Sequence, residues 1–448
     1  MLKKWFTIAA AVLTCGALTV RDAYGKTPSN ENFAQLRAAA EKGDAKAQHD
    51  LGLCCDAAGD PKQALHWYRK AAEAGYAEAQ SDLGVLYYCG EGVPKDLVQA
   101  AFWFRKAAES GYASAQFRLG ELYYSGEGVK QDHEQAVYWF RKAAEQKNVG
   151  GMIRLGDCLA QGHGVTKDEK LAAVWMRKAA ETGNAEAQKK LGVCYTSGKG
   201  VAKDPVKAAY WFRKSAEQGL KEAQFAFGLC CYSGEGVPRD LEQAVCWFRK
   251  SAEQGYVYSQ MFLGRCYHYG EGVAKDPVQA AHWSRKAAEQ GNAASQSHLA
   301  GCYFNGWGVP RDLEQAVYWF RKAAEQGDAM AQNNLGGCYR DGAGVARDLK
   351  QAVYWFRKAA EQGDHSGQCN LGVCYVSGEG VPQDFAQAAY WLRKSAEQGN
   401  DQAQSNLAIL YATGRGVGKD PEQAVYWFRK AAAQGNEKAK QGLKMLGY

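Results

Sequence analysis

Apolar residues recur along this chain with a period of 36 residues, and tryptophan marks the period most clearly. The tryptophans of this series are Trp67, Trp103, Trp139, Trp175, Trp211, Trp247, Trp283, Trp319, Trp355, Trp391 and Trp427. A fixed period of this size is typical of a solenoid, in which each unit is too small to bury its own apolar face and packs it against its neighbours. The pattern therefore predicts about eleven similar units.

The first half of each unit has the spacing of an amphipathic helix. Ala187, Leu191 and Tyr195 lie at i, i+4 and i+8, so one helical face carries all three. A glycine followed by Asn or Asp often precedes such a segment, and these residues suit the end of one helix and the cap of the next. A Gly-x-Gly-Val loop follows the segment, as at residues 198–201.

The second half of each unit predicts another helix that begins after an aspartate. Asp240 precedes Gln243 by three residues, which is the spacing of a capping box. Trp247 and Phe248 follow on the face that also carries alanines, so this face is expected to be buried. Every unit therefore consists of two helices joined by a turn.

These elements together predict an all-α fold. We expect a right-handed α-solenoid of about eleven 36-residue helix-turn-helix repeats with a half unit at each end. The solenoid spans residues 44–435, an amino-terminal capping helix spans 26–43, and a carboxy-terminal half repeat spans 436–448.

Residues 1–25 differ from the repeats and have the pattern of a secretory signal peptide. Two lysines precede an apolar run at residues 5–20, and Ala23 and Gly25 supply the small side chains of a cleavage site. No other stretch has the roughly 18 consecutive apolar residues that a membrane helix needs. We expect an exported protein, periplasmic or secreted, without a stable membrane span. Cys15 raises the alternative of a lipoprotein, although the residues before it lack the small side chain expected there.

The repeated pattern AQxxLGxxYxxGxGVxxDxxxAxxWxxKAAExG resembles the Sel-one-like repeat, a relative of the tetratricopeptide repeat. The segment 223–255 fits it almost position by position, except that Phe227 and Cys231 replace Leu and Tyr. The resemblance covers roughly residues 40 to 448. It implies a solenoid of antiparallel helix pairs that acts as a scaffold for proteins, in a family that includes secreted bacterial factors. It does not identify a partner.

The cysteines are numerous, 14 in all, and most of them occupy one position of the first helix. These are Cys54, Cys158, Cys194, Cys230, Cys266, Cys302, Cys338 and Cys374. Packed helices approach to roughly 9 to 10 Å, whereas a disulfide needs Cα atoms within about 7 Å, so these cysteines should not pair with one another. Other units have leucine at this position, which favours a buried apolar role. Cysteine-rich relatives have a second cysteine in each unit, and here alanine replaces it.

Catalytic and metal-binding patterns are absent from the sequence. Its eight histidines include no HxxxH pair, and no CxxC, GxSxG, P-loop or SxxK motif occurs. We therefore expect no cofactor, no metal and no enzyme activity. Lys+Arg 55 against Asp+Glu 48 gives a net charge of only +7, much of it in a periodic Arg-Lys pair typical of a solvated helix face. This pattern argues against nucleic-acid binding.

Binding is expected where the units differ, because the shared positions are needed for packing. By resemblance to tetratricopeptide repeats, the first helices line a concave groove through the residue after Ala-Gln and those four and seven further on. The predicted partner-binding residues are Phe117, Arg118, Glu121, Tyr124, Arg154, Lys189, Lys190, Phe225, Tyr232, Met261, Arg265, His268, Phe304, Trp307, Asn334 and Asn370. The middle of this groove is apolar and aromatic, which suits a peptide with apolar anchors. The alternative is that several of these side chains pack against the neighbouring unit.

Two runs within this set indicate possible ligand groups. Arg118, Arg154 and Lys190 form a basic run that could meet a carboxylate, and the amides of Asn334 and Asn370 could pair with an extended peptide backbone. Either run could also be solvated surface. Trp307 replaces the usual glutamate of a loop, where it is either an exposed contact residue or folded back onto a helix.

The sequence thus favours an exported scaffold that binds a protein or peptide in its concave groove. Two alternatives remain open at this point. One is a secreted hydrolase acting on β-lactams or the cell wall, and the other is a structural protein that binds peptidoglycan through the aromatic row.

Overall fold

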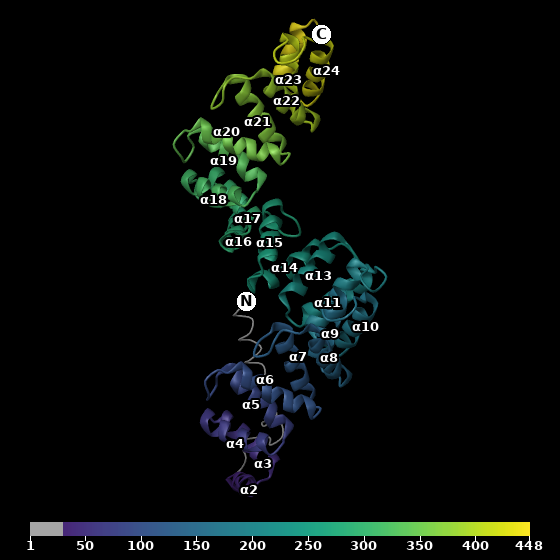
Figure 1. The fold of residues 1–448 in the computed structure, drawn as a ribbon. Helices are drawn as coiled ribbons and strands as arrows, with labels where there is room; N and C mark the ends of the chain where they lie inside the picture. The colour runs from purple at the N-terminus through teal and green to yellow at the C-terminus, as the bar shows by residue number, and fades with distance from the viewer. Residues whose placement is uncertain (1–29) are drawn as a thin grey trace. The chain divides into compact units, whose positions relative to one another are not determined.

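The computed structural model describes residues 30–448, so the predicted signal peptide and Cys15 lie outside the described residues. Within residues 30–448 the chain forms 24 helices and no strand (Figure 1), which confirms the predicted all-α solenoid of helix pairs. The helices belong to two compact units, one ending at Gln218 and the other beginning at Gly219.

The amino-terminal unit contains one leading helix and five helix pairs. Its helices are α2 (Asn30–Glu41), α3 (Ala45–Ala57), α4 (Pro61–Glu73), α5 (Ala77–Cys89), α6 (Leu97–Glu109), α7 (Ala113–Ser125), α8 (His133–Glu145), α9 (Val149–Gln161), α10 (Glu169–Glu181), α11 (Ala185–Ser197) and α12 (Pro205–Glu217). The odd-numbered helices are the first helices of their pairs.

The carboxy-terminal unit contains six helix pairs and one closing helix. Its helices are α13 (Lys221–Ser233), α14 (Leu241–Glu253), α15 (Val257–Tyr269), α16 (Pro277–Glu289), α17 (Ala293–Asn305), α18 (Leu313–Glu325), α19 (Ala329–Asp341), α20 (Leu349–Glu361), α21 (His365–Ser377), α22 (Phe385–Glu397), α23 (Asp401–Thr413), α24 (Pro421–Ala433) and α25 (Glu437–Met445).

Seven of the eleven first helices begin at an Asn or Asp side-chain cap, as the sequence predicts, and α5, α7, α13 and α15 begin without one. The Oδ1 atom of Asn184 accepts a hydrogen bond from the backbone N of Ala187 at 3.0 Å, and Asp328 caps Ala331 in the same way at 2.7 Å. Except at Lys147, the residue before each cap is a glycine with a positive φ, for example 94° at Gly183, which a residue with a Cβ adopts only with strain.

The second helices begin at an aspartate, but the predicted capping box is only half present. The Oδ1 atom of Asp240 accepts from the backbone N of Gln243 at 2.9 Å. The backbone N of Asp240 is not bonded to the Gln243 side chain, because it donates to the carbonyl of Cys231 at 2.8 Å. This second bond ties the start of α14 to the end of α13, so the aspartate fixes the pair as well as the helix end.

The Gly-x-Gly-Val loops lie directly on the preceding helix pair. The second glycine has a positive φ, 69° at Gly308, and a Cβ atom at that position would collide with the carbonyl of Pro277. The glycine is therefore required both by the turn and by the close approach of two backbones. These loops are structural turns, as predicted.

The core of each pair is a contact between a glycine and a large side chain. A Cβ atom at Gly228 would lie 2.7 Å from Cε1 of Phe248, so the ring of the second helix packs on bare backbone of the first. Phe248 and its equivalents Phe104, Phe140 and Phe356 are among the largest fully buried side chains. The glycine of the repeated Leu-Gly motif therefore lets the two helices approach closely.

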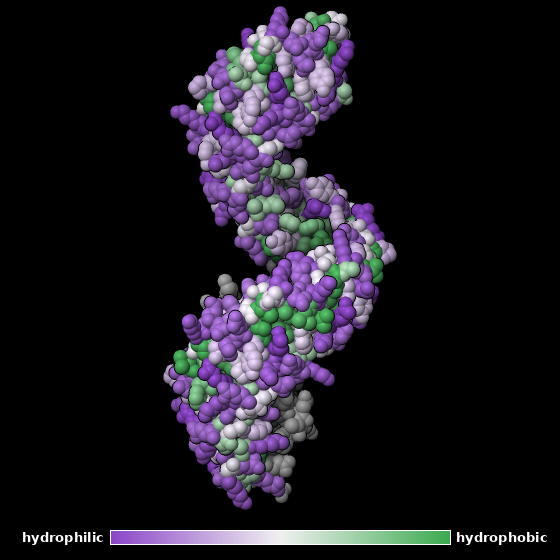
Figure 2. All heavy atoms as spheres, turned by 45° about the vertical axis from the view of Figure 1, so that its right-hand side comes forward, coloured by the Kyte–Doolittle hydropathy of each residue, from purple (hydrophilic) through white to green (hydrophobic). Residues whose placement is uncertain are grey.

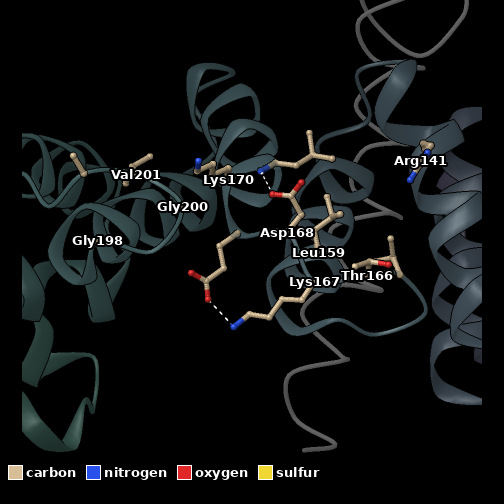
Figure 3. Close-up of a pocket in the computed structure, with 13 residues that line it drawn as sticks. Arg141, Leu159, Thr166, Lys167, Asp168, Lys170, Gly198, Gly200 and Val201 are labelled. Carbon is tan, nitrogen blue, oxygen red and sulfur yellow. Dashed lines mark hydrogen bonds and ion pairs between the residues drawn. The ribbon is translucent and has the colours of Figure 1, made fainter.

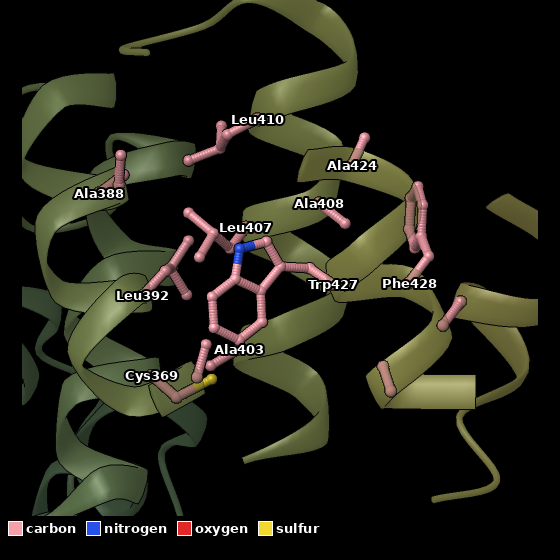
Figure 4. Packing of buried hydrophobic residues seen from close by; sticks show 14 residues of the cluster. Cys369, Ala388, Leu392, Ala403, Leu407, Ala408, Leu410, Ala424, Trp427 and Phe428 are labelled. Carbon is pink, nitrogen blue, oxygen red and sulfur yellow. The ribbon is translucent and has the colours of Figure 1, made fainter. Parts of the chain in front are cut away.

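The tryptophan series connects neighbouring pairs in the core. Figure 4 shows the indole of Trp427 reaching from α24 toward Leu407 of α23 and Leu392 of α22. Cys369 belongs to the same buried cluster. Because side chains from successive pairs share one cluster, each pair supplies apolar surface that its neighbour covers.

The cysteines of the described residues are free thiols, in agreement with the geometric argument. Most of the series at the common helix position is buried, where other units have leucine. Burial raises the pKa of the Cys266 and Cys302 thiols to about 11, so both are protonated at neutral pH and are poor nucleophiles.

Candidate partner-binding face

The side chains of the first helices that do not pack in the core form one face in each unit, here called the first-helix face. The residue two after the leucine of the Leu-Gly motif marks it, because Val193, Val373 and Ile409 at that position are exposed. All sixteen residues predicted to bind a partner are half-buried or exposed. The residues that follow Ala-Gln, or its equivalent, in each unit are at most partly accessible to solvent. The buried ones are small side chains and one histidine, namely His49, Ser81, Ser297, Cys369 and Ser405.

The predicted basic run of the amino-terminal unit is largely neutralised by ion pairs between first helices. Arg154 donates from Nη2 to Oε2 of Glu121 at 3.0 Å, and Nζ of Lys190 lies 2.6 Å from Oδ1 of Asp157. The carboxylate that each of these two cations meets belongs to the preceding first helix, 33 residues earlier in the chain. Lys189 pairs with Glu186 on its own helix at 2.8 Å.

Arg118 differs from the other cations of this run. No ion pair or hydrogen bond holds its guanidinium within residues 30–448, and burial lowers its pKa. The guanidinium lies 5.7 Å from the ring centroid of Phe117. The preceding first helix has Val85 where Glu121 and Asp157 stand in later units, which explains the missing partner.

Tyr124 lies in a small cluster with two histidines that sequence reasoning did not select. Its hydroxyl is 3.0 Å from Nδ1 of His163, and the rings of His133 and His163 stack with centroids 5.5 Å apart. The guanidinium of Arg154 lies 4.8 Å from the Tyr124 centroid. The signal in the sequence was His163 at a loop position where five of the ten loops have glutamate.

The carboxy-terminal unit brings Phe225, Tyr232 and Arg265 together in an aromatic cluster. The ring of Phe225 lies 5.4 Å from that of Phe262, and the guanidinium of Arg265 lies 5.0 Å from the Phe262 centroid. Arg265 also donates to the hydroxyl of Tyr232 at 2.6 Å. Tyr258, whose ring is 6.2 Å from that of Phe225, is 49% exposed at the edge of the cluster.

Tyr258 and Phe262 were missed from the sequence because each lies outside the three rows chosen for the groove. The cluster, defined by Phe225, Tyr232, Tyr258, Phe262 and Arg265, joins helices α13 and α15. Its large aromatic side chains and arginine are the residue types that contribute most to protein interfaces. Met261 lies on the same helix and is half-buried.

Trp307 and His268 also lie together, with ring centroids 5.7 Å apart. Trp307 is 50% exposed, so it both contacts the helix α15 and presents half its surface to solvent. The ring of His298 lies 4.8 Å from that of His268, and its Nδ1 atom is 2.8 Å from Oγ of Ser284. Burial, with a smaller effect of His268, lowers the pKa of His298 to about 4.

The Ser284 and His298 pair has the spacing of a nucleophile and its base, but the serine is inaccessible. Ser284 is 3% exposed, and it occupies the core position that Phe248 and Phe356 fill in other units. The Nε2 atom of His298, which an orienting carboxylate would hold in a catalytic triad, is buried without a partner among the described residues. The pair is therefore part of the packing of α16 against α17.

A hollow of about 370 Å³ lies between the first helices α17 and α19. Its lining includes three predicted residues, Phe304, Asn334 and Asn370, together with Arg340 and Gly337. The Nδ2 atom of Asn370 donates to Oδ1 of Asn333 at 2.8 Å, so the predicted amide run is partly connected by its own hydrogen bonds.

A wider hollow of about 880 Å³ lies among the loops of the amino-terminal unit (Figure 3). Some of its polar groups are paired: Nζ of Lys167 is 2.7 Å from Oε1 of Glu169, and Asp168 caps the backbone N of Leu171 at 2.9 Å. The lining also includes side chains that form no hydrogen bond or ion pair among residues 30–448, namely those of Arg141, Thr166 and Lys170. This hollow is a wide gap between structural turns.

The exposed face of the second helices carries a different ladder of aromatic side chains. Tyr426 packs edge-on against Trp427 with centroids 5.0 Å apart, and Nζ of Lys430 lies 4.7 Å from the Tyr426 centroid. The same arrangement recurs in other pairs, for example at Tyr390. Figure 2 shows that hydrophobic side chains form separate patches on a mostly hydrophilic surface.

Two kinds of site are missing from the described part of the chain. No helix between residues 30 and 448 has the length and apolar character that crossing a membrane requires. In the same range, histidine, cysteine, aspartate and glutamate side chains form no group of three or more that could hold a metal ion.

The fold and its repeated helix pairs define an α-solenoid, and comparison with known families identifies the kind of repeat. The Sel1 repeat model matches residues 45–76, 77–112, 113–148, 150–184, 185–220, 221–256, 257–292, 293–328, 329–364, 365–400 and 401–436. The chain therefore belongs to the Sel1 repeat family.

Two solved structures show the likeness most plainly. One is c5321, a protective antigen present in uropathogenic Escherichia coli strains and displaying an SLR fold, which is 43% identical with a TM-score of 0.85 over 92% of this chain and 90% of that one. The other is a Sel1 repeat protein from Oxalobacter formigenes, 34% identical with a TM-score of 0.54 over 70% of this chain and 93% of that one. A comparison with curated proteins gave no match.

Proposed function

We propose that this chain is an exported scaffold that binds a segment of a partner protein through its first-helix face. Sel1 and tetratricopeptide-like solenoids are typical of protein–protein interaction scaffolds, which supports the general class. The proposal assigns no chemistry of its own to the chain. The binding surface is the part of each unit that packing leaves free to differ.

The observation that carries the proposal is the aromatic cluster around Phe225. It combines an exposed tyrosine, Tyr258, and an exposed arginine, Arg265, with half-buried rings beneath them. Half-buried rings hold the exposed groups in place, so little side-chain freedom is lost when a partner binds. Such a surface suits an apolar or aromatic anchor residue of a peptide.

Export is the second part of the proposal. The pattern of residues 1–25 supports it, and the description of the 43% identical relative as a protective antigen is consistent with it. A fusion of residues 1–30 to a reporter that is active only outside the cytoplasm tests this part alone. Activity of the reporter is expected, and its loss when residues 5–20 are deleted is the matched control.

Binding is best tested with a displayed library of random dodecapeptides, because the partner is unidentified. Peptides enriched on the wild-type chain should bind Tyr258→Ala at least tenfold more weakly. The matched control is Tyr354→Ala, since Tyr354 is also 49% exposed but lies on the second helix α20. The enriched peptides could instead bind the Tyr258 variant normally and lose affinity for the Tyr354 variant. This result would assign binding to the second helices and contradict the proposal. Retention on isolated peptidoglycan with no enrichment of peptides would favour a wall-binding protein.

A further inference from the structure

Two glycines in the middle of first helices have no packing reason to be glycine. Gly301 of α17 and Gly337 of α19 stand two residues after the leucine of the Leu-Gly motif, where other units have Val193, Val373 or Ile409. A Cβ atom built at either glycine meets nothing within 4 Å. Glycine is the least favourable helical residue after proline, so its presence at these two sites calls for another explanation.

Both glycines line the hollow between α17 and α19, and they are what opens it. The missing side chains leave space above Phe304 and Phe320, which form the apolar part of the lining. The equivalent positions of other units hold side chains such as Val373, which would occupy this space. The hollow is therefore a local feature of two adjacent units.

The polar groups around the hollow leave donors and acceptors unused. Asn334 has no hydrogen bond within residues 30–448, so its amide can both donate and accept. Asn333 accepts from Asn370 through Oδ1, which leaves its own NH₂ group available. Arg340 and Asp341 face the same hollow but bind each other, with Nε to Oδ1 at 2.8 Å and Nη2 to Oδ2 at 3.0 Å. Arg340 also donates from Nη1 to Oδ1 of Asn370 at 3.4 Å, so Asn370 keeps one amide hydrogen and one oxygen lone pair for a ligand.

The polar groups that line the hollow suit an uncharged ligand that has both amide N–H and C=O groups. The only charged pair in the lining neutralises itself, so a charged ligand would find no counter-ion there. An amide side chain matches a peptide group, because each has one carbonyl acceptor and N–H donors. The apolar rings and the space left by the glycines suit one neutral side chain.

The asparagines also recur at the spacing of an extended chain. Asn334, Asn370 and Asn406 occupy the same position on α19, α21 and α23. Successive packed helices lie roughly 10 Å apart. Three residues of an extended peptide span roughly the same distance, at about 3.3 Å each. One asparagine can therefore meet every third residue of a bound strand.

We propose that the hollow between α17 and α19 holds one uncharged side chain of an extended peptide whose backbone pairs with Asn334, Asn370 and Asn406. This inference rests on the proposed function, because it takes a peptide as the ligand of the first-helix face. It adds the chemical class, a neutral segment in extended conformation, and the place at which its anchor residue is held.

The test fills the hollow without harming the helix. Gly337→Leu places a good helix former where open space is available, so its melting temperature should equal or exceed that of the wild type. Dodecapeptides selected on the wild-type chain and anchored in the hollow should bind this variant at least tenfold more weakly. Asn334→Ala, which removes no internal hydrogen bond, should weaken the same peptides. Val193→Leu, at the equivalent position of α11, should leave their affinity unchanged.

The outcomes separate this inference from the proposed function. Selected peptides that bind Gly337→Leu as tightly as the wild type would overturn the role of the hollow while leaving peptide binding intact. Failure to enrich any peptide on the wild-type chain would overturn both. Binding of chitotriose to the wild type but not to Gly337→Leu would make the hollow a saccharide site and would also contradict the inference.

Discussion

The Nε2 atom of Gln254 lies 2.8 Å from Oε1 of Gln224, and this contact links the end of one helix pair to the first helix of the same pair. Gln254 also donates to the carbonyl of Gly219 at 2.9 Å. The arrangement recurs with Gln188 and Gln218 in the amino-terminal unit. It explains why almost every first helix has a buried glutamine near its start. The Nε2 group of this glutamine donates to a backbone carbonyl and its Oε1 atom accepts from the second glutamine, as at Gln260.

Three units lack the second glutamine, having Ala74, Ser110 or Thr182 instead, and one of them predicts a stabilising substitution. The Oε1 atom of Gln80 is buried without a partner, because Ser110 stands where Gln146 and Gln254 stand in other units. Ser110→Gln should supply the missing donor and raise the free energy of unfolding by about 1 kcal/mol. Thermal unfolding followed by circular dichroism would measure the gain. Thr182→Gln is the control and should gain less, because Met152 offers no amide to its unit.

Lys147 is the only residue other than glycine with a positive φ within residues 30–448, at 63°. The equivalent positions are glycines such as Gly111 and Gly183. Lys147→Gly should therefore stabilise the chain by about 1 kcal/mol, because it relieves a left-handed conformation. Urea unfolding measures the effect, and a lower midpoint for this variant would contradict the account. Lys142→Gly, inside α8, should destabilise by a similar amount.

Two glycines of the same unit should respond to alanine in opposite directions. Gly301→Ala adds a methyl group in open space within a helix and should stabilise by about 1 kcal/mol. Gly308→Ala places a Cβ atom against the carbonyl of Pro277 at a positive φ and should destabilise by about 2 kcal/mol. Measuring both melting temperatures checks the argument, and a loss of stability in Gly301→Ala would show that its space is not free.

His49 predicts a dependence of stability on pH. Burial disfavours its charged form, but the carboxylate of Asp50, 3.7 Å from Nδ1, and the hydrogen bond to Asp82 outweigh this and raise the pKa of His49 to about 9. Its Nε2 atom lies 2.8 Å from Oδ2 of Asp82. Because the folded pKa lies above the unfolded value of about 6.5, the stabilisation is complete below pH 6.5 and is lost as pH rises through about 9.

The comparison of wild type with His49→Gln isolates this effect. The wild type should be more stable by on the order of 2 kcal/mol at pH 6, and the difference should shrink by pH 10. The melting temperatures of both proteins across this range give the measurement. A difference that stays constant with pH would mean that the imidazole does not titrate between these values.

The fold could be predicted from the sequence because every unit repeats the same local signals. Asn184 and Asp240 mark helix starts by their side-chain chemistry, and both are caps in the structure. The capping box was only half right, because the backbone N of Asp240 had a closer partner in Cys231. That contact joins two helices, so a pattern local to one helix did not reveal it.

The candidate site was less predictable because it depends on contacts between units. The sequence alone leaves the basic run open between a ligand site and solvated surface, and in the structure Arg154 and Lys190 pair with Glu121 and Asp157 on the adjacent first helices. The pairing could have been found by noting that these acids lie 33 residues earlier. The role of Gly337 could not be found from the sequence, because only the packing shows which helical glycines are needed for a close contact.

Hydroxyl-radical footprinting of the chain with a bound, library-selected peptide tests the central claim most directly, since it reports the solvent exposure of individual side chains. We predict that Tyr258, Met261 and Trp307 become protected, while the second-helix residues Tyr318, Tyr354 and Tyr390 keep their reactivity. Protection of the second-helix tyrosines with unchanged reactivity of Tyr258 would contradict the assignment of partner binding to the first-helix face.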